Sequence, residues 1–153
     1  MNIEKFTIKS QEVIQGAQNM AQAEGHQSIE NGHILKALIE TDESVLPYIL
    51  KKQGIKLEGI KQATGRLVES YPKVSGGQLY ISQNANMTLV NAEKTAKEMG
   101  DEFVSLEHLL IGLAGNKDDI GNILRDAGLN KKLIQQLTGE LRKGEKVSSQ
   151  NAE

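Results

Sequence analysis

Glu30 and His33 have the Glu-x-x-His spacing with which helices of carboxylate-bridged di-iron proteins hold metal. Such a site needs two of these motifs and further inward-facing glutamates. The corresponding stretch later in the chain, Ser105-Leu106-Glu107-His108, has a hydroxyl where the first carboxylate belongs. We therefore expect no metal site. We expect both histidines to lie at helix starts and to bond to the backbone or to a neighbouring polar group. A helical metalloenzyme is the alternative from another functional class.

The sequence also departs from the patterns of nucleotide-binding loops and of enzyme nucleophiles. Gly139 and Gly144 have the glycine spacing of a P-loop, but Glu145 stands where that loop needs lysine, and the segment follows a predicted helix. The absence of cysteine excludes disulfides, thiolate-bound zinc and a thiol nucleophile. We therefore expect a binding module, not an enzyme, with no cofactor of its own.

Composition favours a helical globular protein. The 153 residues are 38% hydrophobic, 25% charged and only 3% aromatic, so the core must be built from aliphatic side chains and methionine. A net charge of −2 argues against a nucleic-acid partner. The sequence has no apolar run of membrane-spanning length, and its first residues do not form a signal peptide. We expect a cytoplasmic protein without a membrane partner.

The chain contains two copies of one unit. A shift of 75 residues places 6–41 on 81–116 without a gap, matching Ala17 with Ala92 and His33 with His108. Near the loop at 41–45 the shift falls to 74, after which Gly54 matches Gly128. The matches keep their order and fall on apolar and turn positions, which indicates a tandem repeat of helical units.

Each copy is predicted to form four helices, giving an all-α fold of eight helices in two pseudo-symmetric units. The fourth helix is expected at about 56–69 in the first copy and 130–142 in the second. Local signals mark the boundaries, since hydroxyl side chains cap helix starts and glycine ends helices. These signals are Thr7 and Ser82 at the starts of the first helices, Gly25 and Gly100 at their ends, and Gly54 and Gly128 after the third.

The predicted organisation is one domain over 1–145, with repeat one at about 6–69 and repeat two at about 81–142. The segment 70–78 contains proline and paired glycine, which is typical of a surface connector. Residues 146–153 have no apolar period and are expected to begin a linker. Because this tail looks flexible, we expect the fragment to be monomeric.

His33-Ile34-Leu35, the segment 107–113 and the opening Phe6-Thr7 together resemble the double Clp repeat, which forms the N-terminal domain of AAA+ unfoldases. The resemblance covers about residues 1–145. The segment 100–105 and the divergence of the second copy are most similar to the ClpB-type disaggregase chaperones.

The resemblance implies a mobile domain that contacts unfolded or aggregated polypeptides and passes them to an ATP-driven ring. The AAA+ modules would follow residue 153, so the full-length protein is expected to be a hexameric ATPase that uses ATP and Mg. The family motif implies a role in substrate handling for Thr7, Asp101 and Glu107. From the residues alone, Thr7 caps a helix, Asp101 closes a turn, and Glu107 lies where a helix dipole favours negative charge.

A chaperone contact should be an apolar strip that the fold leaves exposed. The candidates are the apolar residues out of phase with the inward stripes: Ile8, Leu79, Ile81 and Leu106, with Leu89 at the edge. Ile8 and Ile81 flank the two cap positions and are expected around one groove. For any single one of these residues, core packing is the favoured role and contact with a polypeptide is the alternative.

A second function follows from the protease-coupled branch of the same family. There the resemblance implies that a glutamate before each histidine helps to hold phosphorylated arginine. This sequence has Glu107 before His108 but Gly32 before His33, so one of the two sites is incomplete. Docking of an adaptor protein is a further possibility from that branch.

Overall fold

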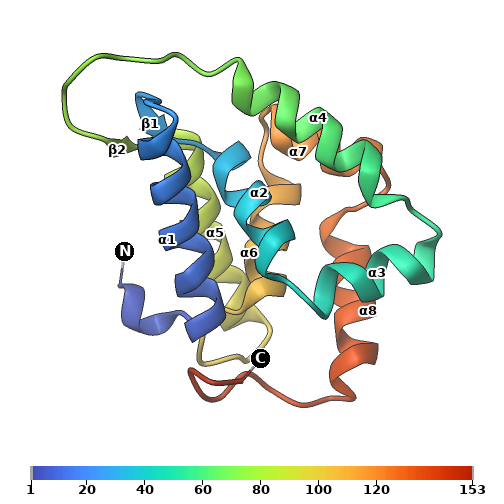
Figure 1. Ribbon diagram of the computed structural model, residues 1–153. Helices are drawn as coiled ribbons and strands as arrows, with labels where there is room; N and C mark the ends of the chain where they lie inside the picture. Colours follow the sequence, from blue (N-terminus) through green and yellow to red (C-terminus); the bar gives the residue numbers. More distant parts are fainter. Residues whose placement is uncertain (1, 153) are drawn as a thin grey trace.

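The computed structural model describes residues 2–152, and these form eight α-helices with two short strands (Figure 1). A 3-10 turn, η1 (Ile3–Lys5), precedes the first copy. The helices of this copy are α1 (Ile8–Ala23), α2 (Asn31–Thr41), α3 (Val45–Gln53) and α4 (Leu57–Glu69). The second copy contains α5 (Gln83–Glu98), α6 (Leu106–Gly115), α7 (Asp119–Asp126) and α8 (Lys131–Arg142). The predicted all-α fold of two four-helix units is confirmed.

Local signals in the sequence set the helix boundaries as predicted. The Thr7 hydroxyl accepts a hydrogen bond from the Ser10 amide at 3.2 Å, and the Ser82 hydroxyl accepts one from the Ala85 amide at 3.0 Å. Each bond satisfies an amide that has no partner within its own helix. Gly100 adopts a φ of 74° just after α5, in the left-handed region that glycine enters at little cost.

In each copy, the segment before the first helix pairs through its backbone with the other copy. Strand β1 (Ser28–Ile29) pairs in parallel with β2 (Tyr80–Ile81), and Phe6 forms the equivalent bridge with Val104. The Thr7 amide donates to the Val104 carbonyl at 2.9 Å, while the Ser82 amide donates to the Ile29 carbonyl at 3.0 Å. This exchange locks the two units into one body.

The exchange separates the two residues that were expected around one groove. Ile8 begins α1, whereas Ile81 pairs with Ile29, which follows the end of α1. A helix of 16 residues is about 24 Å long. The two side chains therefore lie at opposite ends of α1.

The core lies around α2 and α6, which occupy the centre of the molecule (Figure 1). Helices α1 and α5 cover one side of this pair, and the other helices cover the opposite side. Nine of the ten residues of α6 are buried. α5 approaches α6 so closely at Gly112 that an added Cβ would lie 2.6 Å from the Thr88 carbonyl oxygen.

The C-terminal segment packs against the body instead of leaving it after α8. Val147, in the stretch expected to be a linker, is buried. The polypeptide after Arg142 turns back through left-handed conformations at Lys143 and Gly144 and then lies near the start of α1. The outer limits of the predicted domain and linker, Met1 and Glu153, lie outside the described residues.

Candidate functional site

A buried charged cluster joins α6, α8 and the turn after α5. Arg142, on α8, donates through one nitrogen to both carboxylate oxygens of Asp101 at 3.0 Å, and it also donates to Glu107 on α6. Glu107 additionally accepts from the Ser105 hydroxyl at 2.5 Å. The arginine side chain is 14% exposed and the carboxylates are less so. The structure therefore brings Asp101 and Glu107 together around a cation that sequence reasoning did not identify.

The hydrogen bonds of His108 fix its proton. Its Nδ1 accepts from the Ser105 amide at 2.9 Å, so the proton of the neutral ring lies on Nε2 and is donated to Asp101 at 2.7 Å. Burial lowers the pKa of His108 despite the nearby Glu107 and Asp101 carboxylates. Burial alone would raise the pKa of Asp101, but bonds from Val147, Arg142 and His108 outweigh it and hold that pKa below its usual value. Around neutral pH the cluster therefore contains a neutral histidine, an arginine cation and a carboxylate at Asp101.

The first copy has an equivalent arrangement around His33, at the start of α2, but forms it from different side chains. His33 Nδ1 accepts from the Glu30 amide at 2.9 Å, and its Nε2 bonds to His26, which occupies the position of Asp101. Burial lowers the pKa of His33 to about 4, with His26 contributing next. The Tyr71 hydroxyl accepts from the Gly32 amide at 3.1 Å and fills the space that a side chain at position 32 would need. The predicted role of both helix-start histidines in bonding to backbone and polar neighbours is confirmed.

The two Glu-x-x-His-like corners serve as helix caps. The Glu30 carboxylate accepts from the Ser28 hydroxyl at 2.6 Å and takes part in the cap of α2. Among residues 2–152 no group of three or more metal-ligating side chains is arranged to hold an ion.

The predicted apolar candidates divide into exposed and buried residues. Ile8 is 43% exposed, and both Ile81 and Leu79 are partly exposed. Leu89 and Leu106 are only 1% and 2% exposed, so core packing is confirmed for these two and their candidacy as exposed contacts is wrong. The reason is the position of α6: it packs against α5, α7 and α8, which encloses both leucines in the core.

Thr7 is fully buried at the junction of the two copies. Its hydroxyl donates to the Ser10 hydroxyl at 2.9 Å in addition to capping α1. A direct contact of Thr7, Asp101 or Glu107 with a large partner would require the surface to open, because all three residues are buried.

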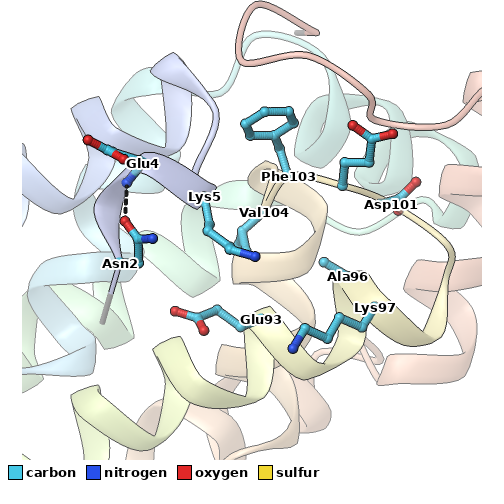
Figure 2. A pocket seen from close by; sticks show the side chains of 10 residues that line it. Asn2, Glu4, Lys5, Glu93, Ala96, Lys97, Asp101, Phe103 and Val104 are labelled. Atoms are coloured by element: carbon cyan, nitrogen blue, oxygen red, sulfur yellow. Dashed lines mark hydrogen bonds between the residues drawn. The ribbon is translucent and has the colours of Figure 1, made fainter.

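A pocket of about 630 Å³ lies between the N-terminal segment, the second half of α5 and the turn after it (Figure 2). The Lys5 and Glu93 side chains face each other across it, and Lys97 lies on the same side as Glu93 (Figure 2). Phe103 and Val104 add apolar surface, while Asp101 links the pocket to the buried charged cluster. The pocket therefore combines apolar surface with charges of both signs.

Sequence reasoning missed two exposed apolar residues on α5. Met87 and Val90 are 45% and 50% exposed and lie three residues apart on one helix face. The equivalent positions in the first copy are Glu12 and Gln15. A comparison of the two copies for positions where only one is apolar would have found both residues.

The sequence matches known proteins over its whole length. The profile of the family described as Clp repeat (R) N-terminal domain matches residues 5–127. The chain is 46% identical over 153 residues to the chaperone protein ClpB of Bacteroides thetaiotaomicron and 40% identical to that of Porphyromonas gingivalis. In both comparisons all of this chain is covered, but only 18% of the relative.

Solved structures share the fold. The N-terminal domain of Hsp104 from Candida albicans superimposes with a TM-score of 0.84 at 23% identity, covering 97% of this chain and 99% of that domain. The N-terminal domain of ClpV1 from E. coli gives a TM-score of 0.80 at 20% identity, covering 97% and 90%.

Among residues 2–152, no helix combines the length and the apolar character needed to cross a membrane. The repeated four-helix unit, the paired histidine caps and the sequence match point to one family. This chain belongs to the Clp repeat (R) N-terminal domain family, and its sequence relatives are ClpB chaperones.

Proposed function

We propose that this chain is the substrate-recognition domain of a ClpB-type disaggregase and that it binds exposed apolar segments of unfolded or aggregated polypeptides. The observation that carries the proposal is the set of exposed apolar side chains along α5 and at its two ends. We call this set the α5 face; its members are the exposed Ile3, Ile8, Tyr80, Met87 and Val90, together with the partly exposed Ile81.

The α5 face has the extent of a peptide-binding surface. Ile81 directly precedes α5, Met87 and Val90 lie along it, and the pocket at its second half is lined by the residues on both sides of Ile3. A helix of 16 residues spans about 24 Å, which an extended peptide of about seven residues would cover. Charged side chains around the pocket favour a peptide segment that contains both charged and apolar residues over a wholly apolar segment.

The exposed areas support weak binding. Covering a half-exposed isoleucine, valine or methionine is worth about 1 kcal/mol, since complete burial is worth about 1.5–3 kcal/mol. Four such contacts give about 4 kcal/mol before the cost of ordering the peptide is subtracted, so the dissociation constant should be about 1 mM or weaker. Weak, sequence-tolerant binding suits a client recognised by exposed hydrophobicity, and several domains on one ring would raise the avidity.

Within this proposal Ile8 and Ile81 contact polypeptide directly. Thr7, Asp101, Glu107, Leu89 and Leu106 act from inside the fold by holding α1, α5 and α6 in place. The bound segment would pass to an AAA+ ring, which would use ATP and Mg as a hexamer in the cytoplasm. This chain spans 18% of the ClpB relatives and would supply the domain before those modules.

The protease-coupled alternative receives less support. Its phosphoarginine site needs a free carboxylate at Glu107, but Arg142 of the same chain already bonds to this group. In the first copy, Tyr71 and Val68 occupy the space beside Gly32. Binding of a peptide from an adaptor is the second candidate, because one structural neighbour is a complex of the ClpV N-domain with a VipB peptide.

Binding of a fluorescent, permanently unfolded polypeptide tests the proposal. Val90→Ser and Ile8→Ser should each weaken binding by about threefold to tenfold, because each removes about 1 kcal/mol of apolar contact. Leu141→Ser on α8 is the matched control, since this exposed leucine lies outside the α5 face. Equal affinities of all three variants and the unaltered chain would contradict the proposed surface.

A further inference from the structure

We infer that residues 143–150 form a strap that belongs to the folded domain, and that Asp101, Glu107 and Arg142 act by seating it and so fix where the chain leaves the domain. The inference goes beyond polypeptide binding and does not depend on it. It assigns the buried charged cluster a positioning role instead of a direct contact with a client.

The middle of the strap is anchored at Val147. Its side chain is 5% exposed, although its neighbours in sequence are polar or charged. The Val147 amide donates to Asp101 Oδ1 at 3.0 Å, and the Val147 carbonyl accepts from the Glu102 amide at 2.8 Å. Because Arg142 binds the same Asp101 carboxylate, the end of α8 and the strap share one anchor.

The end of the strap is anchored at the first helix. The Ile8 amide donates to the Gln150 carbonyl at 2.8 Å, and the Gln150 side chain donates to the Glu4 carbonyl at 2.7 Å. Thr7, the neighbour of Ile8, pairs through its own amide with Val104. The strap therefore ends beside the junction of the two copies.

The internal repeat supports this interpretation. The Gln27 amide donates to the Pro72 carbonyl at 3.2 Å, which repeats the bond from Glu102 to Val147 at a shift of 75 residues. Pro72 belongs to the connector that delivers the chain to the second copy. By the same geometry, the strap sets the place where the chain leaves the second copy.

The different residues at Pro72 in the first copy and Val147 in the second agree with a role in holding the chain as it leaves each copy. Pro72 has no amide hydrogen, so the first copy needs no acceptor opposite it. Position 26, the counterpart of Asp101, is accordingly a histidine and not a carboxylate. Valine has an amide hydrogen, and the second copy supplies the Asp101 carboxylate to accept it. Release of the strap would free about eight residues, or roughly 25 Å of additional extended chain beyond the domain.

Hydrogen exchange of single amides in this chain tests the inference. Val147→Ser should speed exchange of the Ile8 amide by about tenfold or more, because loss of the buried side chain weakens the strap. Asp101→Asn should have the same effect. The matched control is Val74→Ser, in the connector, where the side chain is exposed and the Ile8 amide should be unaffected.

The Thr7 amide separates strap release from general unfolding, since it bonds to Val104 and not to the strap. The inference predicts fast exchange at Ile8 with protection kept at Thr7. Equal exchange of the Ile8 amide in the Val147→Ser variant and the unaltered chain would overturn it. Simultaneous loss of protection at both amides would also overturn it, because the segment would then not open separately.

Discussion

Removal of the buried cation is the sharpest perturbation of the charged cluster. Arg142→Met keeps much of the side-chain volume but leaves the Asp101 and Glu107 carboxylates without the group that bonds to both. Breaking a buried ion pair by removing one partner costs about 3–5 kcal/mol, because the remaining charge loses its compensation. We expect a value near 3 kcal/mol, since the arginine side chain keeps 14% exposure.

Urea and thermal denaturation followed by circular dichroism at pH 7 measure this loss. For a domain of this size, about 3 kcal/mol lowers the melting temperature by roughly 10 °C. Arg66→Met is the control, because Arg66 is an exposed arginine in the last turn of α4, the repeat counterpart of α8. Exposed substitutions of this kind change stability by less than about 0.5 kcal/mol.

Neutralising the carboxylates separates the effect of unpaired charge on stability from the effect of lost packing. Asp101→Asn with Glu107→Gln, added to Arg142→Met, should recover part of the lost stability because no unpaired charge then remains. A loss below about 1 kcal/mol for Arg142→Met, or a further loss in the triple variant, would refute the proposed electrostatic role.

Two further outcomes follow from the first copy. Gly32→Ala should cost about 1–3 kcal/mol by overpacking, because the added Cβ would lie 2.4 Å from the Tyr71 hydroxyl. Gly59→Ala, with open space around it, should be neutral or slightly stabilising in the same denaturation assay. Equal effects of the two substitutions on stability would contradict the packing around Gly32. Burial lowers the pKa of His33 to about 4 from about 6.5 in the unfolded chain. The contribution of His33 to the free energy of unfolding is therefore complete above pH 6.5 and is lost as the pH falls towards 4. We expect a loss of about 3 kcal/mol between pH 7.5 and pH 4 from this group, and a smaller loss in His33→Asn; identical pH profiles would contradict the assignment.

The parts of the fold set by local chemistry could be predicted from the sequence. Thr7 and Ser82 cap their helices because a hydroxyl before an amphipathic stretch satisfies a free amide wherever the helix later packs. The glycine after α3, Gly54, ends that helix with a φ of 65°. These features need no knowledge of the distant chain.

The parts that depend on contacts between the copies could not be predicted in the same way. Leu106 lies in the first turn of α6, and periodicity within one helix cannot show that neighbours enclose it on every side. The side chain that bonds to both Asp101 and Glu107 is Arg142, far along the chain, and the packing of α8 against α6 and α3 sets where that arginine lies.

The burial of the strap was also beyond sequence reasoning. A single valine, Val147, in a polar tail gives no periodic signal, and polar tails are commonly disordered. The shift of 74 that aligns the fourth helices pairs Pro72 with Lys146, so the repeat in the sequence does not point to Val147. The correspondence of Val147 with Pro72 shows only in the hydrogen bonds that Glu102 and Gln27 donate to their carbonyls.

An NMR titration of this chain with a permanently unfolded polypeptide tests the central claim most directly. Binding on the α5 face should shift the backbone signals of Ile8, Ile81, Met87 and Val90 in fast exchange, with little change in α3 and α7. The affinity should be near the millimolar range worked out from the exposed areas. Unchanged signals at millimolar polypeptide, or shifts confined to α3 and α7, would contradict polypeptide recognition by this surface.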